Sequence, residues 1–148
     1  MKLHNSLGID IGSTTVKIAV LDSDNHILFA DYERHYANIQ ETLALLLSRA
    51  KEKLGEMTVS ASITGSGGLT LSGHLNIPFT QEVVAVATAL QEYAPQTDVA
   101  IELGGEDAKI IYFTGGIDQR MNGICAGGTG SFIDQMASLL QTDASGLN

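Results

Sequence analysis

The stretch IDIGSTTVKIAVL, residues 9–21, decides the fold, because it returns ninety-two residues later as IELGGEDAKIIYF, residues 101–113. The two stretches align without gaps, and an acid (Asp10, Glu102), a glycine and a lysine coincide. Each copy is typical of a strand, a tight turn and a second strand. Thirteen positions leave open the alternative that any two amphipathic hairpins look alike. We favour a duplicated unit, because strand propensity alone would select neither the glycine nor the acid.

Both copies end their first strand near a carboxylate that is followed, two residues later, by a glycine. The backbone N–H groups of such a turn can face an anion, with the acid beside them. Mg²⁺ keeps several waters and is held by one or two carboxylates together with phosphates, so Asp10 and Glu102 need only reach its hydration shell. The hydroxyls of Thr14 and Thr15 and the ammonium of Lys17 offer further contacts to phosphate oxygens. Two such turns on repeated units predict a clamp around the phosphates of a nucleotide.

Composition narrows the class of protein further. The chain of 148 residues is 44% hydrophobic, enough for a buried core, and has 17 acidic residues against 8 basic ones. The net charge of -9 argues against a nucleic-acid partner, which would need lysine and arginine. No apolar run approaches the roughly 20 residues of a membrane span, so we expect a soluble, cytoplasmic protein with no membrane partner. A single cysteine excludes an internal disulfide, but it leaves room for a metal ligand or a reactive thiol.

The rest of the chain alternates between strand-like and helix-like segments. We expect a helix bounded by Asn38 and Gly55. Strands are expected over residues 26–33 and 59–63, a loop over 64–68, and two more helices over 81–93 and 131–140. Other phosphate signatures fail: no G-x-x-x-x-G-K-[ST] motif occurs, and GSGGLTLSG lacks the third glycine of a dinucleotide fingerprint. Four histidines without metal-ligand spacing are interpreted as solvated loop residues: His4, His26, His35 and His74.

Three motifs together resemble one known family: GIDIGSTTVK at residues 8–17, IELGGEDAK at 101–109 and NGICAGGTGSFIDQMA at 122–137. Over nearly its whole length the chain is similar to the BadF/BadG/BcrA/BcrD-type ATPases, the activators of 2-hydroxyacyl-CoA dehydratases and benzoyl-CoA reductases. The third motif is the specific one, since the first two are shared with acetate and sugar kinases, heat-shock 70 proteins and actin. The resemblance implies an α/β, actin-like ATPase fold of two related ribonuclease-H-like lobes with ATP between them.

The resemblance also implies how the chain is divided. Residues 1–95 correspond to the first lobe, with the first phosphate loop and a connecting helix from Glu82 to Tyr93. Residues 96–148 correspond to the start of the second lobe, with the second phosphate loop. In the family the chain continues to a second cluster cysteine and a glycine-rich adenosine-binding motif, and neither occurs in this sequence. We therefore expect the first lobe plus an incomplete second lobe, as a fragment of a longer protein.

By the same resemblance, three acids are candidate catalytic residues: Asp10, Glu102 and Glu106. Asp10 and Glu102 would hold Mg²⁺ through water. The candidate phosphate-binding residues come from both loops: Gly12, Ser13, Thr14, Thr15, Lys17, Gly104, Gly105, Asp107 and Lys109. Two positions depart from the family pattern, because Glu102 replaces the usual aspartate and Glu106 lies where a glutamine is often found.

Cys125 corresponds to the family's iron–sulfur ligand. In the family a homodimer shares one [4Fe-4S] cluster, and each subunit gives it two cysteines. A ferredoxin or flavodoxin donates the electron, ATP changes the angle between the lobes, and a CoA-ester dehydratase or reductase accepts the electron. Apart from the resemblance, a lone cysteine is more often a buried core residue. One cysteine per chain gives a dimer only two ligands, so we expect these 148 residues to hold no stable cluster and to be inactive by themselves.

The implied function is binding and hydrolysis of ATP coupled to low-potential electron transfer. Two alternatives use the same phosphate loops. A small-molecule kinase of the superfamily would need a catalytic acid near the lobe boundary, for which Glu82 is available. A non-catalytic assembly module would bind nucleotide without hydrolysing it.

Overall fold

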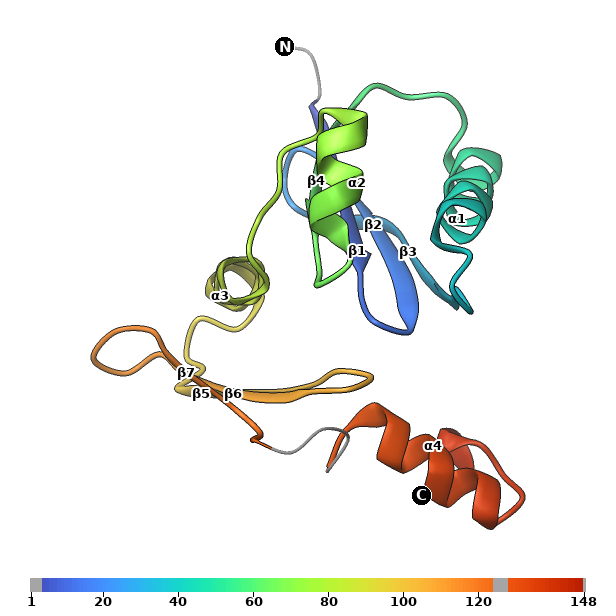
Figure 1. Ribbon diagram of the computed structural model, residues 1–148. Coiled ribbons are helices and arrows are strands. Elements are labelled where there is room, and N and C mark those ends of the chain that lie inside the picture. The colour runs from blue at the N-terminus through green and yellow to red at the C-terminus, as the bar shows by residue number, and fades with distance from the viewer. Residues whose placement is uncertain (1–3, 124–127, 148) are drawn as a thin grey trace. The chain divides into compact units, whose positions relative to one another are not determined.

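The computed structural model describes residues 4–123 and 128–147 of the chain (Figure 1). The chain divides into two compact units, Met1–Ala85 and Val86–Asn148. The boundary falls inside α3, Glu82–Tyr93, so one helix continues from the first unit into the second. None of the helices in the described part of the chain is long and apolar enough to cross a membrane.

The first unit is built on a four-stranded sheet in the order β3-β2-β1-β4. Its strands are β1 (Asn5–Ile11), β2 (Thr15–Leu21), β3 (Ile27–Arg34) and β4 (Val59–Thr64). The first three strands are joined as antiparallel hairpins, whereas β4 runs parallel to β1. The carboxyl ends of β1 and β4 therefore meet at one edge of the sheet, which is where open α/β sheets bind their ligands.

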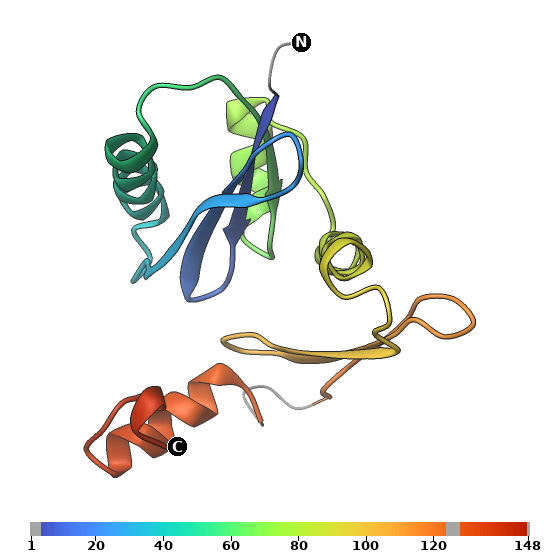
Figure 2. The same ribbon diagram turned by 180° about the vertical axis from the view of Figure 1, so that it is seen from behind.

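Two helices, α1 (Ile39–Leu54) and α2 (Gly68–Leu75), lie on the same side of this sheet (Figures 1 and 2). Strand side chains alternate between the two faces, and those that face the helices form the core. The buried core consists of Ile9, Ile11, Val16, Ile18, Val20, Phe29 and Ile63 from the strands with Leu43, Leu46 and Ala50 from α1. Asp10 lies between two of these core residues, so its side chain points to the opposite face.

The helix predicted between Asn38 and Gly55 is confirmed, with these two residues as its caps. The second helix, α2, was missed, because two of its eight residues are glycine, which disfavours helices. A Cβ on Gly68 would lie 2.7 Å from Ile63 Cγ2, so glycine is what lets the first turn of α2 pack on β4. Tertiary packing, rather than helix propensity, accounts for this element.

The second unit contains an antiparallel sheet in the order β5-β6-β7. Its elements are β5 (Val99–Leu103), β6 (Ala108–Tyr112), β7 (Asp118–Met121), α4 (Gly130–Leu139) and a 3₁₀ helix, η1 (Ala144–Leu147). Lys109 pairs in register with Glu102, as Lys17 does with Asp10. The strand order β3-β2-β1 also matches β7-β6-β5. The two hairpins therefore share their register and strand order, as the predicted duplication requires, and the duplication itself stays a prediction.

Candidate functional site

The first predicted phosphate loop is the tight turn that joins β1 to β2. The backbone N–H of Gly12 donates to the carbonyl of Thr15 at 2.9 Å and closes the turn. Beside it, Lys17 Nζ lies 2.8 Å from Asp10 Oδ2. The Asp10 side chain is 33% exposed, so its carboxylate is accessible to the hydration shell of a metal ion, while Lys17 offers a cation to a phosphate. Within the first unit the structure thus brings together the predicted acid, turn and lysine.

A third segment, residues 64–67 at the end of β4, also lies against Asp10. The N–H of Gly67 donates to the carbonyl of Ile11 at 2.9 Å. Gly65 has a φ of +94°, and a Cβ there would lie 2.3 Å from the Ile11 carbonyl oxygen and 2.4 Å from Asp10 Oδ1. Only glycine allows this approach. Sequence reasoning treated this segment as an ordinary loop, because its place depends on the parallel pairing of β4 with β1, which no local pattern reveals.

The interpretation of His35 as a solvated loop residue is wrong, because its exposed fraction is 8%. It follows β3, whose end pairs with the start of β2, and this brings its side chain to the first phosphate loop. His35 Nδ1 accepts from the N–H of Ala37 at 3.0 Å, so the proton is on Nε2, which donates to the Gly12 carbonyl at 3.2 Å. The N–H of His35 donates to the Thr14 carbonyl at 3.1 Å. The other three histidines are exposed, as expected, but His74 lies on α2 rather than in a loop.

Replacing His35 with alanine should destabilise the first unit, because the Gly12 carbonyl and the Ala37 N–H each lose a partner inside the protein. We expect the free energy of unfolding to fall by about 2 kcal/mol. His74→Ala is the matched control: His74 is exposed on α2, and its loss should cost less than about 0.5 kcal/mol. Urea denaturation followed by circular dichroism measures both variants. Equal effects would contradict the supporting role of His35.

The second phosphate loop repeats this arrangement around a buried lysine. The N–H of Gly104 donates to the carbonyl of Asp107 at 2.8 Å and closes the turn between β5 and β6. Lys109 Nζ lies 3.4 Å from Glu102 Oε1 and 3.1 Å from Asp107 Oδ2, and the Lys109 side chain is 6% exposed. One desolvated cation therefore holds two acids of the loop together. Glu102 keeps its pairing with the lysine although it is one methylene longer than aspartate.

The second loop is also hydrogen-bonded to the start of α4. The N–H of Gly130 donates to the carbonyl of Gly104 at 2.8 Å. The N–H of Ser131 donates to the carbonyl of Gly105 at 3.0 Å, and the Ser131 hydroxyl donates to the same oxygen. A Cβ on Gly130 would lie 3.1 Å from the Gly104 carbonyl oxygen, so the approach favours a residue without one. The first N–H groups of α4 are thus directed at the phosphate loop.

Four of the remaining predicted site residues lie in or next to the two loops. Ser13 and Glu106 are exposed in their loops. Thr14 and Thr15 take part in the first loop through their backbone carbonyls, which accept the hydrogen bonds from His35 and Gly12. Cys125 lies outside the described residues, so its role as a cluster ligand stays a prediction.

A group of metal-ligand types, Asp22, Asp24 and His26, comes together in the turn between β2 and β3. Asp22 Oδ1 accepts from the N–H groups of both other residues, at 2.8 and 2.9 Å. The hydrogen bond from the His26 N–H is the main reason that the pKa of Asp22 lies below its usual value. The hydrogen bonding of the turn is enough to explain this cluster.

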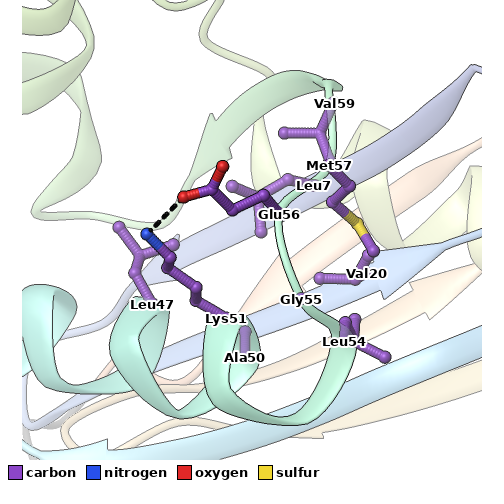
Figure 3. Close-up of a pocket in the computed structure, with 10 residues that line it drawn as sticks. All are labelled: Leu7, Val20, Leu47, Ala50, Lys51, Leu54, Gly55, Glu56, Met57 and Val59. Carbon is purple, nitrogen blue, oxygen red and sulfur yellow. Dashed lines mark ion pairs between the residues drawn. The ribbon is translucent and has the colours of Figure 1, made fainter.

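A cavity of about 370 Å³ opens at the amino ends of β1 and β4, at the opposite end of the sheet from Asp10 (Figure 3). Its lining is largely apolar and includes Leu7, Val20, Leu47, Leu54 and Val59. Lys51 and Glu56 also line it, and they form an ion pair of 2.9 Å. Because these two charges neutralise each other, the cavity offers little to a phosphate. The candidate site therefore stays at the edge that holds Asp10.

The residues at that edge fit a magnesium-bound nucleotide. Asp10 and Lys17 offer a hard oxygen ligand and a cation, the pair of charges that Mg²⁺ and phosphate groups require. Gly65 lies where a Cβ would press on the Asp10 carboxylate, so the loop after β4 approaches the acid without covering it with a side chain. The carboxylate and the ammonium at this edge match the magnesium-bound nucleotide that the two loops predict.

The fold and its two loops define the class of protein: an actin-like ATPase fold of ribonuclease-H type. The chain is similar to the crystal structure of (R)-2-hydroxyglutaryl-CoA dehydratase component A from Acidaminococcus fermentans, with a TM-score of 0.82 and 28% identity over 96% of this chain and 56% of that one. It is also similar to the activator of the 2-hydroxyisocaproyl-CoA dehydratase from Clostridium difficile, solved with bound ADPNP. There the TM-score is 0.80 and the identity 26%, over 95% of this chain and 54% of that one.

The chain belongs to the BadF/BadG/BcrA/BcrD ATPase family, whose family model matches residues 7–147. The activator of lactoyl-CoA dehydratase from Anaerotignum propionicum is 31% identical over 144 residues, which are 93% of this chain and 54% of that protein. The chain thus spans about half the length of these relatives. The family predicted from the three motifs is confirmed.

Proposed function

We propose that the protein is an ATP-dependent activator, which binds and hydrolyses ATP and passes a low-potential electron to a CoA-ester dehydratase or reductase. The observation that supports this best is the second loop, which joins the Lys109–Glu102 pair directly to the start of α4. The similar proteins from Acidaminococcus fermentans and Anaerotignum propionicum are named as a dehydratase-activating ATPase and a dehydratase activator. In this proposal residues 1–95 form the first lobe and residues 96–148 begin the second.

The two lysines have different tasks in the proposed mechanism. The Lys17 side chain is 50% exposed, so it can turn from Asp10 toward a phosphate oxygen of ATP. Lys109 is buried between two acids and keeps the second loop in shape instead. Asp10 and Glu102 are the acids that would hold a hydrated Mg²⁺ through its waters. ATP supplies the phosphoryl group and the free energy of its hydrolysis.

We propose that the start of α4 transmits the structural effect of the nucleotide to the electron carrier. Ser131 holds the phosphate loop through the Gly105 carbonyl, so a shift of that loop moves the first turn of α4. Cys125 precedes this turn in the chain and is the proposed ligand of a [4Fe-4S] cluster shared by a homodimer. The cluster would supply the electron after reduction by a ferredoxin or flavodoxin.

Ser131→Ala should uncouple hydrolysis from activation in the intact protein, because it removes the hydroxyl bond to Gly105 while the backbone bonds stay. We expect ATP hydrolysis to stay within about twofold of the unaltered protein and electron transfer to the partner to fall about tenfold. Ser138→Ala, exposed on the same helix, should change neither rate. Phosphate release and dehydratase activation are measured in parallel. A proportional fall of both rates would contradict the coupling.

The same assays separate the two alternative functions. A small-molecule kinase would show ATP turnover that depends on an added sugar or acid, rather than on a partner enzyme and iron. A non-catalytic assembly module would keep its function when hydrolysis is lost. No residue contact in the described part of the chain favours either alternative over the activator.

A further inference from the structure

Thr64, the last residue of β4, has a hydroxyl that the fold buries without pairing. Its Oγ1 is shielded from solvent and has no hydrogen-bond partner among residues 4–123 and 128–147. An unpaired buried hydroxyl costs the folded state free energy, and buried polar groups in native proteins are nearly always hydrogen-bonded. Valine has the same shape and would avoid that cost. The hydroxyl therefore points to a partner that is bound from solution.

The position of Thr64 identifies that partner. Asp10 has Thr64 of β4 as its in-register partner on one side and Lys17 of β2 on the other, so the three side chains stand in a row on one face of the sheet. The two oxygens of the Asp10 carboxylate differ in their surroundings. Oδ2 accepts a hydrogen bond from Lys17, whereas Oδ1 faces Gly65, the residue that follows Thr64. The oxygen that Lys17 leaves available thus lies on the β4 side of the carboxylate, where Thr64 is.

We propose that the Thr64 hydroxyl positions a water molecule of the hydrated Mg²⁺ that accompanies the nucleotide, next to Asp10 Oδ1. This inference rests on the proposed nucleotide site and adds to it a positioning residue from β4. Lys17 lies on the β2 side of Asp10 whether it pairs with Oδ2 or turns toward a phosphate, so its ammonium repels a metal ion from that side and leaves the β4 side for the metal's waters. A hydroxyl suits such a water, because it can accept a hydrogen bond from the water and donate one to a neighbouring oxygen.

Calorimetric titration of the intact protein with ADPNP, with and without Mg²⁺, tests this role. Thr64→Val should lower the affinity for ADPNP about tenfold when Mg²⁺ is present and leave the weaker affinity without Mg²⁺ unchanged. Thr64→Ser, which keeps the hydroxyl, should return the affinity to within about threefold of the unaltered protein. Thr58→Val is the matched control, since Thr58 is exposed just before β4 and far from its carboxyl end. It should change neither affinity.

Thermal unfolding without nucleotide gives a second readout. The Tm of Thr64→Val should equal or exceed that of the unaltered protein, because the substitution removes an unpaired buried hydroxyl. A lower Tm that Thr64→Ser restores would assign the hydroxyl a structural partner and overturn the inference. An unchanged affinity with Mg²⁺, or an equal loss with and without it, would overturn the inference but leave the nucleotide site intact. If the unaltered protein fails to bind ADPNP, the proposed function itself falls, and the inference with it.

Discussion

Gly65→Ala is expected to destabilise the first unit by about 3 kcal/mol or more. The added Cβ would lie 2.3 Å from the carbonyl oxygen of Ile11, at a φ of +94° that alanine already disfavours. That oxygen cannot move aside freely, because it accepts the hydrogen bond from the N–H of Gly67. The Cβ would also lie 2.4 Å from Asp10 Oδ1, so the variant should disturb the carboxylate of the candidate site as well.

Gly55→Ala is the matched control for this substitution. Gly55 also has a positive φ, +78°, but no atom lies within 4 Å of the position of its Cβ. Its replacement should cost about 1 kcal/mol, which is the conformational penalty alone. Urea denaturation of both variants separates this penalty from the contact with Ile11 and Asp10. A Gly65→Ala protein as stable as Gly55→Ala would show that the loop after β4 does not approach Asp10 as described.

Asp10→Asn in the intact protein is expected to lower the rate of ATP hydrolysis by about 100-fold or more, while the fold survives. The amide cannot supply the negative charge that orients the waters of Mg²⁺. The ion pair with Lys17 is solvent-exposed, so its loss should cost at most about 1 kcal/mol of stability.

Asp24→Asn, in the exposed turn after β2, serves as the control and should hydrolyse ATP at the unaltered rate. Phosphate release at saturating Mg²⁺ and ATP, with thermal unfolding, distinguishes lost chemistry from lost folding. Hydrolysis by Asp10→Asn within a fewfold of normal would exclude a catalytic role for this acid.

The likeness of the two hairpins could be predicted because its signal is local. An acid, a glycine and a lysine at fixed spacing lie within one hairpin, and hairpin register then pairs the acid with the lysine. In both loops of the candidate site, this register brings the acid and the lysine together. Prediction succeeded where the partners are close in sequence.

Features that depend on distant segments were beyond sequence reasoning. Gly65 meets Asp10 only because β4 runs parallel to β1, after two intervening strands and a helix. His35 reaches the Gly12 carbonyl because of where β3 ends beside β2. Ser131 suits a helix N-terminus by residue type, but its hydroxyl donates to Gly105 across the unit rather than capping α4. In each case long-range strand pairing or packing, not local propensity, places the residue.

We propose that the edge of the sheet at Asp10 binds a magnesium-bound nucleotide. Calorimetric titration of the intact protein with ADPNP, with and without Mg²⁺, tests this claim most directly. We expect saturable binding that is tighter with Mg²⁺, and a loss of about tenfold or more of this affinity in Asp10→Asn. No saturable binding, or binding that is equally tight without Mg²⁺ and in Asp10→Asn, would contradict it.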